Sequence, residues 1–364
     1  MYSMTETQVQ LQDSAKRYFS RNSDTLTGRR NLGGFSKQWE EFTEMGWMAA
    51  PVTEILGGYG GAAELALISR EIGYAGCEFS FIHAAVIPGI VISQLDNTPF
   101  QKETLEAIFS GDRLIYSPLV EQFVGGRSMV TCIENDTHFQ LSGTVSTLPG
   151  ASYATDFCVL AQSGQGVGND AGYSLFIVPA DSEGLRADTE NAIDGRLLQT
   201  ITFSDVKLDE KQRLSSAATE SVIQSSINAA VLAQCADLVG CTQKMFDLTK
   251  DYLQIRKQFG SSLAEFQALR HRLADMYAEL CLANAMLKRA VDKYAEDPVD
   301  SHSISAAKYS IANAAKYVGT QAIQLHGAIA MTEEYELGRY FKRAIIAEKT
   351  FGDPYFHLHR FKAT

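Results

Sequence analysis

Hydrophobic positions recur at two different periods along the chain, and the period changes twice. From Thr5 to about Phe109, and again from about Ser215 onward, apolar residues fall three and four positions apart, as on a helix with one buried face. Between about Asp112 and Leu208 the pattern alternates, as it does in half-buried strands. The patterning therefore predicts an α+β chain, mostly α, with a small antiparallel β domain between two helical domains.

The first helical region carries large aromatic residues on one face. Trp39, Phe42 and Trp47 fall at helical spacing, so we expect them in a core. A glycine cluster at 57–61 follows them. We interpret it as a turn between helices, because no strand precedes it and no Lys-Ser/Thr pair follows, as a phosphate-binding loop would require.

The middle region predicts paired strands. Residues 129–145 hold two apolar runs around Asn135-Asp136, which is the pattern of a hairpin. Further strands are expected at 156–163, 173–180 and 198–208. The glycines between 164 and 172 separate two strands and open no helix, so the sequence favours a loop there over a dinucleotide-binding motif.

The last region predicts long helices joined by short turns. Residues 215–257 contain no proline, a second helix follows Gly260 and ends near Asp297-Pro298, and a third covers Ser303 to Ile323. Long antiparallel helices with short connections form a bundle, here predicted as a four-helix bundle. The expected domains are therefore 1–111 (N-terminal, helical), 112–212 (middle, β) and 213–364 (C-terminal, helical bundle).

Composition narrows the class of protein. The formal net charge of the 364 residues is -11 and no basic block occurs, which argues against nucleic-acid binding. Six cysteines lie scattered without a CxxC pair, and neither a signal peptide nor a membrane-spanning apolar stretch is evident. The sequence predicts a reduced, cytoplasmic protein without a membrane span. His357 and His359, two apart on a helix, point to different sides, so no metal site is expected.

One short segment combines a helix break with polar and aromatic residues. Arg256, Gln258 and Phe259 stand just before Gly260, where a long helix must end and side chains can face a ligand. A guanidinium is a bidentate partner for a pyrophosphate, and an aromatic ring offers an apolar surface to a nucleotide. The alternative is an ordinary amphipathic helix pair with a surface arginine.

This segment resembles the second helical domain of the acyl-CoA dehydrogenase family. The matching residues are Tyr252, Arg256, Gln258, Phe259, Gly260, Phe266, Gln267, Leu273, Ala274, Asp275 and Met276. The resemblance implies that FAD is the cofactor and that Arg256 and Phe259, with Gln258 and Gln267 beside them, reach the FAD of a neighbouring subunit. Gln324, His326 and Gly327 match the start of a turn that approaches the same FAD, although Ala328 and Ala330 replace its later glycines.

The half of the family site that serves the subunit's own FAD looks altered. In the family, a Thr-Glu-Pro and a Trp-Ile-Thr segment touch the isoalloxazine ring. Ser117-Pro118 and Thr147-Leu148-Pro149 occupy those places here.

The resemblance also implies a reaction, in which a carboxylate removes the α-proton of an acyl-CoA thioester while the β-hydride passes to flavin. Such a base works when burial raises its pKa toward the working pH. Phe351 and Ala230 stand at the two places where the family carries this glutamate. The acids that could substitute are Asp237, Asp353 and, on the preceding helix, Glu348. We expect none of the three to be the base, which leaves the catalytic residue unassigned.

Three functions remain in competition. The first is an FAD-dependent acyl-CoA dehydrogenase of fatty acid or steroid catabolism, with electron-transfer flavoprotein as the electron acceptor. Such an enzyme would be either a homodimer or homotetramer, or an α2β2 enzyme in which this chain is the subunit that lacks the base. Bacterial heteromeric steroid dehydrogenases, which this chain resembles, are of the second kind. The others are a flavin-dependent oxidase or monooxygenase on the same fold, and a non-catalytic subunit without flavin. Fold alone does not decide between them.

Overall fold

The computed structural model describes residues 4–22, 32–96, 98–124, 130–135, 138–163, 172–215 and 220–363. The chain divides into two compact units. The helical unit comprises Met1–Gly28, Ala66–Glu78 and Val231–Thr364, and the sheet unit comprises Arg29–Leu65 and Phe79–Ala230. The division into three domains stays a prediction, and most of the glycine-rich loop expected at 164–172 lies outside the described residues.

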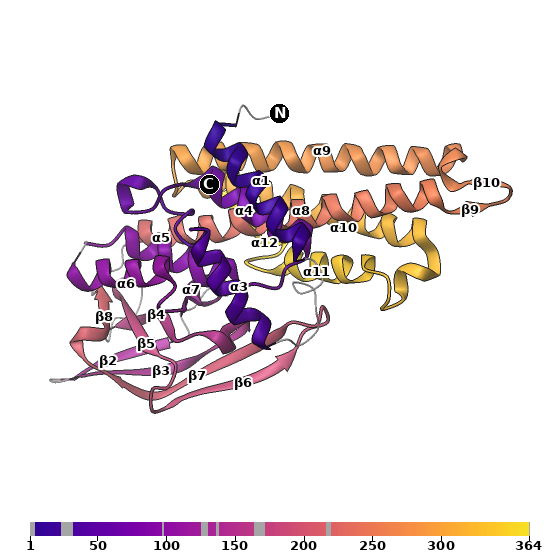
Figure 1. Cartoon of the computed structure of the whole chain (residues 1–364). Helices are drawn as coiled ribbons and strands as arrows, with labels where there is room; N and C mark the ends of the chain where they lie inside the picture. The colour runs from indigo at the N-terminus through magenta and orange to yellow at the C-terminus, as the bar shows by residue number, and fades with distance from the viewer. Residues whose placement is uncertain are drawn as a thin grey trace. The chain divides into compact units, whose positions relative to one another are not determined.

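The helical unit is built on long helices, which Figure 1 labels. Its elements are most of α4 (Ala62–Ala75) and α8 (Glu220–Ile255), with α1 (Glu6–Arg21), α9 (Gln267–Glu296), α10 (Ser301–His326), α11 (Leu337–Lys349) and α12 (Pro354–Ala363). The predicted helices after residue 215, after Gly260 and over 303–323 are confirmed. α8 is long and apolar enough to cross a membrane, but 94% of its apolar window is buried in the protein, as in the core helix of a folded domain.

Two glycines let α4 and α8 approach closely. A methyl group on Gly73 would lie 1.9 Å from the backbone oxygen of Asp237, and one on Gly240 would lie 2.0 Å from that of Arg70. Both distances are far below van der Waals contact, so a larger residue at either position would push the helices apart. The α4–α8 contact thus fixes the part of α8 that carries Asp237.

The sheet unit holds an eight-stranded sheet with helices and short turns around it. The strand order is β6-β7-β3-β2-β4-β5-β8, and β1 pairs with β4. The strands are β1 (Ile115–Tyr116), β2 (Val130–Glu134), β3 (Phe139–Pro149), β4 (Asp156–Ser163), β5 (Gly172–Pro179), β6 (Leu185–Asn191), β7 (Leu197–Leu208) and β8 (Arg213–Ser215). The other elements are α3 (Leu32–Glu44), π-helical turn Ile82–Val86, α5 (Ile87–Ser93), α6 (Pro99–Ser110) and α7 (Leu119–Val124).

The sheet confirms the predicted strands but is not wholly antiparallel. β2 and β3 form the expected hairpin, with Glu134 opposite Phe139. However, β4 pairs in parallel with both β1 and β2. The chain enters β4 only after the 3₁₀ turn Ala151–Tyr153, and β4 then lies beside β2 rather than beside β3, the strand that precedes it. β3 returns antiparallel to β2 and the chain then crosses to the other side of β2, so β4 runs parallel to β2, a pairing that alternation alone does not reveal.

The aromatic residues expected in a core are confirmed there. Trp39, Phe42 and Trp47 are all buried, and the Phe42 and Trp47 rings meet edge to face at 4.9 Å. The glycine cluster is the predicted turn. A methyl group on Gly58 would lie 2.0 Å from the carbonyl oxygen of Val52. Any residue larger than glycine at position 58 would therefore prevent the backbone from forming this turn.

Candidate functional site

The connection between α8 and α9 is a short hairpin that we call the tip hairpin (residues 256–266). β9 (Lys257–Gln258) pairs with β10 (Ser261–Ser262), and Ser261 lies opposite Gln258. Phe259 and Gly260 form the turn with φ of 54° and 87°. A two-residue hairpin of this kind needs positive φ at both positions, which glycine tolerates and a bulky phenylalanine does not. The strain at Phe259 marks it as a candidate functional residue.

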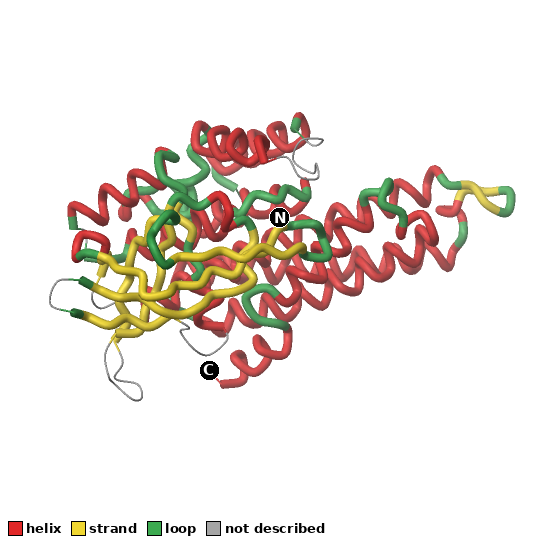
Figure 2. Tube along the Cα trace, turned by 90° about the horizontal axis from the view of Figure 1, so that it is seen from below, coloured by secondary structure: helices red, strands yellow, loops and turns green. Residues whose placement is uncertain are grey.

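The tip hairpin presents its predicted cofactor residues to solvent. Phe259 is 92% exposed, and its ring lies edge to face with the Phe266 ring, with 6.3 Å between the ring centroids. Arg256, Gln258 and Gln267 are exposed as well. Within the described chain, the Arg256 guanidinium has no hydrogen-bond or ion-pair partner. Figure 2 shows the hairpin projecting at the far end of the long helices. A strained aromatic ring and an unpaired guanidinium held there are suited to a ligand outside this chain.

The C-terminal end of α10 lies against the last turns of α8. The His326 ring stacks on the Tyr252 ring at 4.4 Å, its Nδ1 lies 2.8 Å from the Ala322 carbonyl oxygen, and its Nε2 lies 3.1 Å from the Tyr335 hydroxyl oxygen. Burial lowers the pKa of His326, although the Ala322 carbonyl partly opposes this, so the ring is neutral. Both ring nitrogens are therefore engaged within the chain. The His326 side chain positions the turn rather than facing a cofactor.

The neighbours of His326 behave differently. Gln324 and Gly327 are exposed, and Gly327 has φ 68° and ψ −143°, a conformation that only glycine adopts readily. Apart from Gly327 itself, its chain neighbours and the adjoining backbone of its own helix, no atom of the described residues lies within 4 Å of the position where its side chain would begin. Gln324 and Gly327 thus lie at the C-terminal end of α10. Tyr252 of α8, the helix that leads into the tip hairpin, packs against this end through His326. Backbone at Gly327 is open to close approach from outside.

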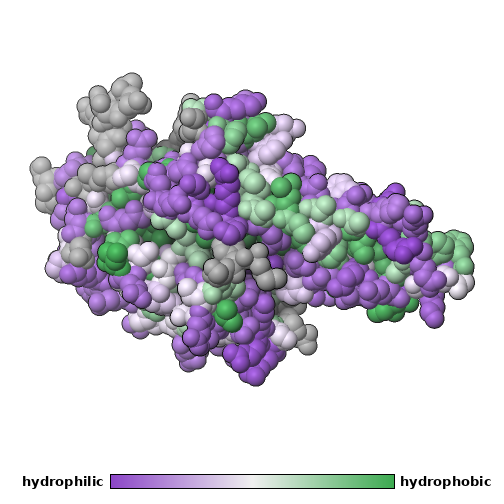
Figure 3. Space-filling view, turned by 90° about the horizontal axis from the view of Figure 1, so that it is seen from above, coloured by the Kyte–Doolittle hydropathy of each residue, from purple (hydrophilic) through white to green (hydrophobic). Residues whose placement is uncertain are grey.

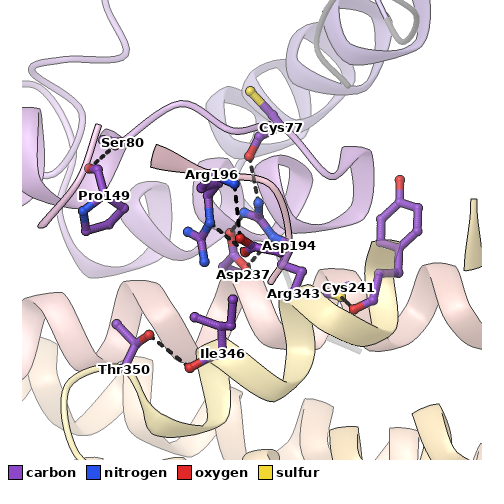
Figure 4. A network of polar contacts seen from close by, with 11 residues as sticks. Cys77, Ser80, Pro149, Asp194, Arg196, Asp237, Cys241, Arg343, Ile346 and Thr350 are labelled. Atoms are coloured by element: carbon purple, nitrogen blue, oxygen red, sulfur yellow. Dashed lines mark hydrogen bonds and ion pairs between the residues drawn. The ribbon is translucent and has the colours of Figure 1, made fainter. Parts of the chain in front are cut away.

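Asp237, one of the acids weighed as a base, is locked in a buried ion pair (Figure 4). Its two carboxylate oxygens accept from Arg343, at 2.5 Å from Nη2 and 3.3 Å from Nε. Nη1 of Arg343 donates to the Cys77 carbonyl oxygen at 2.9 Å. Burial alone would lower the pKa of Arg343, but the Asp237 carboxylate outweighs it and raises that pKa above its ordinary value. Both carboxylate oxygens of Asp237 are thus taken up by a permanent cation and neither is directed toward a substrate.

The other two acids are also engaged. Asp353 is exposed, and its Oδ1 accepts from the backbone N–H of Phe356 at 2.7 Å, which caps the first turn of α12. Glu348 lies 3.6 Å from Nζ of Lys316. Phe351, at the place where the family carries its glutamate, is buried with φ 59°. The other expected place holds the fully buried Ala230. Neither place supplies a base.

A buried lysine and a buried histidine hold the turn around Phe351. Nζ of Lys308 donates to the Ala347 carbonyl oxygen at 2.5 Å. Nε2 of His357 lies 2.9 Å from the Phe351 carbonyl oxygen. Burial lowers the pKa of Lys308 to about 8 and that of His357 to about 4. These contacts fix a turn whose strained residue carries no chemistry. His357 was considered only with His359 as a possible metal ligand and Lys308 was not considered, because spacing along a helix does not reveal which backbone group a polar side chain bonds.

The helical unit also contains a cavity of about 920 Å³ lined by α1, α4, α8 and the segment before and into α11. Its charges have both signs, including the pair Lys244–Glu336 at 3.5 Å. Glu71 lines it and is buried, which raises the pKa of that carboxyl although Lys16 partly opposes the shift. None of the residues predicted to bind cofactor or to act as base lines this cavity.

In the segments predicted to face the chain's own flavin, the Thr147 side chain lies outside the described part of the structure, and Ser117 and Pro149 have bonds within the chain. Ser117 is fully buried, and its Oγ donates to the Cys158 carbonyl oxygen at 3.2 Å. The Pro149 carbonyl oxygen accepts from Ser80 Oγ at 2.6 Å, a contact drawn in Figure 4, and from Tyr116 Oη at 3.2 Å. These groups are satisfied inside the chain and offer little to a ring. The tip hairpin therefore has exposed groups that could contact a cofactor, whereas the Ser117 hydroxyl and the Pro149 carbonyl oxygen are already hydrogen-bonded within the chain.

Comparison with known proteins identifies the family models and relatives that the chain matches. Residues 5–112 match the family model described as acyl-CoA dehydrogenase, N-terminal domain, and residues 221–354 match acyl-CoA dehydrogenase, C-terminal domain. Acyl-CoA dehydrogenase IpdE2 of Mycolicibacterium smegmatis is 33% identical over 186 residues, which cover 49% of this chain and 58% of that protein. Probable acyl-CoA dehydrogenase YngJ of Bacillus subtilis is 28% identical over 328 residues, 87% of this chain and 86% of that protein.

The solved structures agree on the fold. The ChsE4-ChsE5 complex from Mycobacterium tuberculosis has a chain of TM-score 0.87 and 21% identity, with 99% of this chain and 97% of that chain covered. Butyryl-CoA dehydrogenase from Megasphaera elsdenii gives a TM-score of 0.86 at 21% identity, with 100% and 99% covered. The fold, the matched domains and the tip hairpin lead to one conclusion: this chain belongs to the acyl-CoA dehydrogenase family.

Proposed function

We propose that this chain is a subunit of an FAD-dependent acyl-CoA dehydrogenase that desaturates an acyl-CoA thioester. In this proposal it lends Arg256 and Phe259 to a flavin held mainly by another subunit, and the catalytic base lies on that other subunit. The observation that carries the proposal is the tip hairpin, where a strained, 92% exposed Phe259 stands beside an unpaired Arg256. The acids of this chain that were candidate bases support it, because all three are engaged in structural contacts.

The residues of the tip hairpin suit two parts of a dinucleotide cofactor, the pyrophosphate and a nucleotide face. The Arg256 guanidinium would hold a pyrophosphate by two parallel hydrogen bonds, and the Phe259 ring would cover an apolar face of the nucleotide. When bound, the flavin accepts the hydride, and that chemistry is the cofactor's own. The contribution of this chain is to hold the cofactor and keep water from it, since its three candidate acids, Asp237, Asp353 and Glu348, are engaged in other contacts.

The exposed face of α9 supports assembly with another subunit. Its solvent side is apolar at three- and four-residue spacing and carries Ala274, Tyr277, Ala278, Cys281, Leu282 and Ala285, all exposed. Figure 3 shows hydrophobic residues along these helices. An apolar stripe of this kind on a soluble helix is typical of a protein interface. The occupant we propose is a second acyl-CoA dehydrogenase-like chain, either a copy or, as favoured by the engaged acids, a different subunit in an α2β2 enzyme.

Two similar proteins support the heteromeric assembly and the substrate class by their names alone. The ChsE4-ChsE5 structure is a complex of two differently named chains, and another similar structure, at 23% identity and TM-score 0.85, is the G363A variant of the steroid ACAD Tcur3481-Tcur3483. We therefore propose an acyl-CoA of fatty acid or steroid catabolism as substrate, electron-transfer flavoprotein as acceptor and the cytoplasm as location. The acyl group itself stays open.

The test is the flavin content of the complex with variants of the tip hairpin. We expect Arg256→Ala in this chain to lower the FAD that co-purifies with the two-chain complex, because a charge-assisted contact to pyrophosphate is lost. Lys257→Ala, which removes a neighbouring exposed cation, is the matched control and should leave FAD unchanged. An Arg256→Ala complex that assembles fully and keeps all its FAD would contradict the proposal.

A further inference from the structure

The proposed function leaves the cavity of about 920 Å³ in the helical unit without a role. All of its lining residues, from α1, α4, α8 and the segment that leads into α11, belong to that unit. Its volume lies within the range of pockets that hold small organic molecules, about 300–1,000 Å³. The residues proposed to contact FAD are not among its lining residues. What this cavity binds can therefore be tested separately from flavin binding.

Glu71 of α4 is buried at the α1 side of the cavity with few hydrogen-bond donors. The residue is 6% exposed, and its Oε1 accepts from Nε2 of Gln12 at 3.4 Å, which is a long hydrogen bond. No other hydrogen bond or ion pair reaches this carboxyl group from the described residues. A hydroxyl group could meet the second oxygen in either protonation state, because a hydroxyl donates to a carboxylate and accepts from a protonated carboxyl.

Two cations stand beside Glu71 without an ion-pair partner. Lys16 on α1 is exposed and Arg70 on α4 is half-buried. Burial raises the pKa of Glu71, and the charges of Lys16 and Arg70 partly oppose this shift. Among the described residues, however, neither cation forms a hydrogen bond or an ion pair. Two cations against one carboxyl group leave a surplus of positive charge, which favours an anionic group between them.

The α8 side of the cavity is aromatic, and its lysine is already paired. Tyr340 Oη donates to the Tyr74 carbonyl oxygen at 3.0 Å, and Tyr74 Oη donates to Oδ2 of Asp247 at 3.3 Å, so both rings are fixed in place. Nζ of Lys244 lies over both rings and 3.5 Å from Oε1 of Glu336. This wall therefore offers apolar ring surface to a ligand, while the unpaired cations lie at the α1 side.

We infer that this cavity binds a 2-hydroxy acid with an apolar or aromatic body. Its carboxylate would lie between Lys16 and Arg70, its hydroxyl group against Glu71, and its body on the rings of Tyr74 and Tyr340. A carboxylate without the hydroxyl group would leave the Glu71 carboxyl unmet beside a like charge, so the site selects for the hydroxyl group. This inference goes beyond the proposed function and does not depend on it.

The first test is isothermal titration of the whole chain with 3-phenyllactate and with 3-phenylpropionate, which lacks only the hydroxyl group. We expect saturable binding of one 3-phenyllactate per chain, and affinity about tenfold lower for 3-phenylpropionate, because a hydrogen bond to Glu71 is lost. Absence of saturable 3-phenyllactate binding at millimolar concentration would overturn the inference. Equal affinity for the two acids would overturn it as well.

The second test places the binding in this cavity. Lys16→Met and Arg70→Met should each weaken 3-phenyllactate binding about tenfold, because a charge-assisted contact is lost. Arg17→Met is the matched control, since Arg17 is an exposed cation on α1 that does not line the cavity, and it should leave the affinity unchanged. Glu71→Leu should bring the affinities for the two acids together. Circular dichroism checks that each variant is folded.

Affinity for 3-phenyllactate that is unchanged in both Lys16→Met and Arg70→Met would mean that the acid binds elsewhere, which would overturn the inference. The FAD content of the two-chain complex should be the same with Lys16→Met as without it, because Lys16 is not among the residues proposed to contact FAD. The outcome of these titrations therefore leaves the proposed function untouched.

Discussion

Removing Arg343 should destabilise the helical unit severely, because it leaves the Asp237 carboxylate buried without a partner. The side chains of the pair are only 11% and 8% exposed. Arg343→Met removes two charge-assisted hydrogen bonds to Asp237 and one to the Cys77 carbonyl oxygen. Breaking a buried ion pair from one side costs about 3–5 kcal/mol.

The assay is amide hydrogen exchange in α8 and α11, which reports the free energy of opening of these helices separately from the sheet unit. Lys342→Met, on the exposed side of α11, is the matched control and should cost less than about 0.5 kcal/mol. The double variant Asp237→Leu with Arg343→Met removes both charges and should recover much of the loss. A cost below about 1 kcal/mol for Arg343→Met alone would refute the reasoning and return Asp237 to the list of candidate bases.

Three further changes test other parts of the account. The pKa of His357 is about 4 in the folded chain against an ordinary 6.5, so the unfolded chain binds this proton more readily. The neutral His357 therefore contributes about 3 kcal/mol to the free energy of unfolding above pH 6.5, and this contribution is lost as the pH falls toward 4. His357→Gln should flatten the dependence of stability on pH in this range, as measured by urea unfolding. Leu282→Arg places a charge on the exposed apolar face of α9, so it should lower the mass of the assembly in light scattering without changing the circular dichroism of the chain. An unchanged mass would mean that this face of α9 is not part of a subunit interface. Gly73→Ala should lower the free energy of unfolding by about 1–3 kcal/mol, because the added methyl group overpacks against α8. A thermal midpoint equal to that of the unaltered chain would contradict the close approach of α4 to α8.

Local patterns predicted most of the elements of the fold. The absence of proline and the helical spacing located α8, α9 and α10, and the two apolar runs around Asn135 located the β2–β3 hairpin. β6 was missed, because six of its seven residues are exposed and no apolar alternation marks it; its pairing with β7 creates the strand. The parallel pairing of β4 was missed because it depends on which strands meet in space.

The candidate site was predicted unevenly for a similar reason. Arg256 and Phe259 stood out because a helix break next to Gly260 is a local signal, and the structure places both at an exposed tip. The role of His326 as a packed, neutral residue, and the partners of Asp237, depend on contacts across the helical unit that no spacing encodes.

The most direct test of the account is FAD binding by this chain alone and then with its partner subunit. The chain is purified without a partner, titrated with FAD and followed by quenching of flavin fluorescence, and the titration is repeated on the co-expressed two-chain complex. The account predicts no saturable binding by the chain alone and tight binding by the complex, with Arg256 required in this chain. Stoichiometric FAD on the chain alone, bleached by an acyl-CoA, would contradict it and would mean that a complete active site exists without a second subunit.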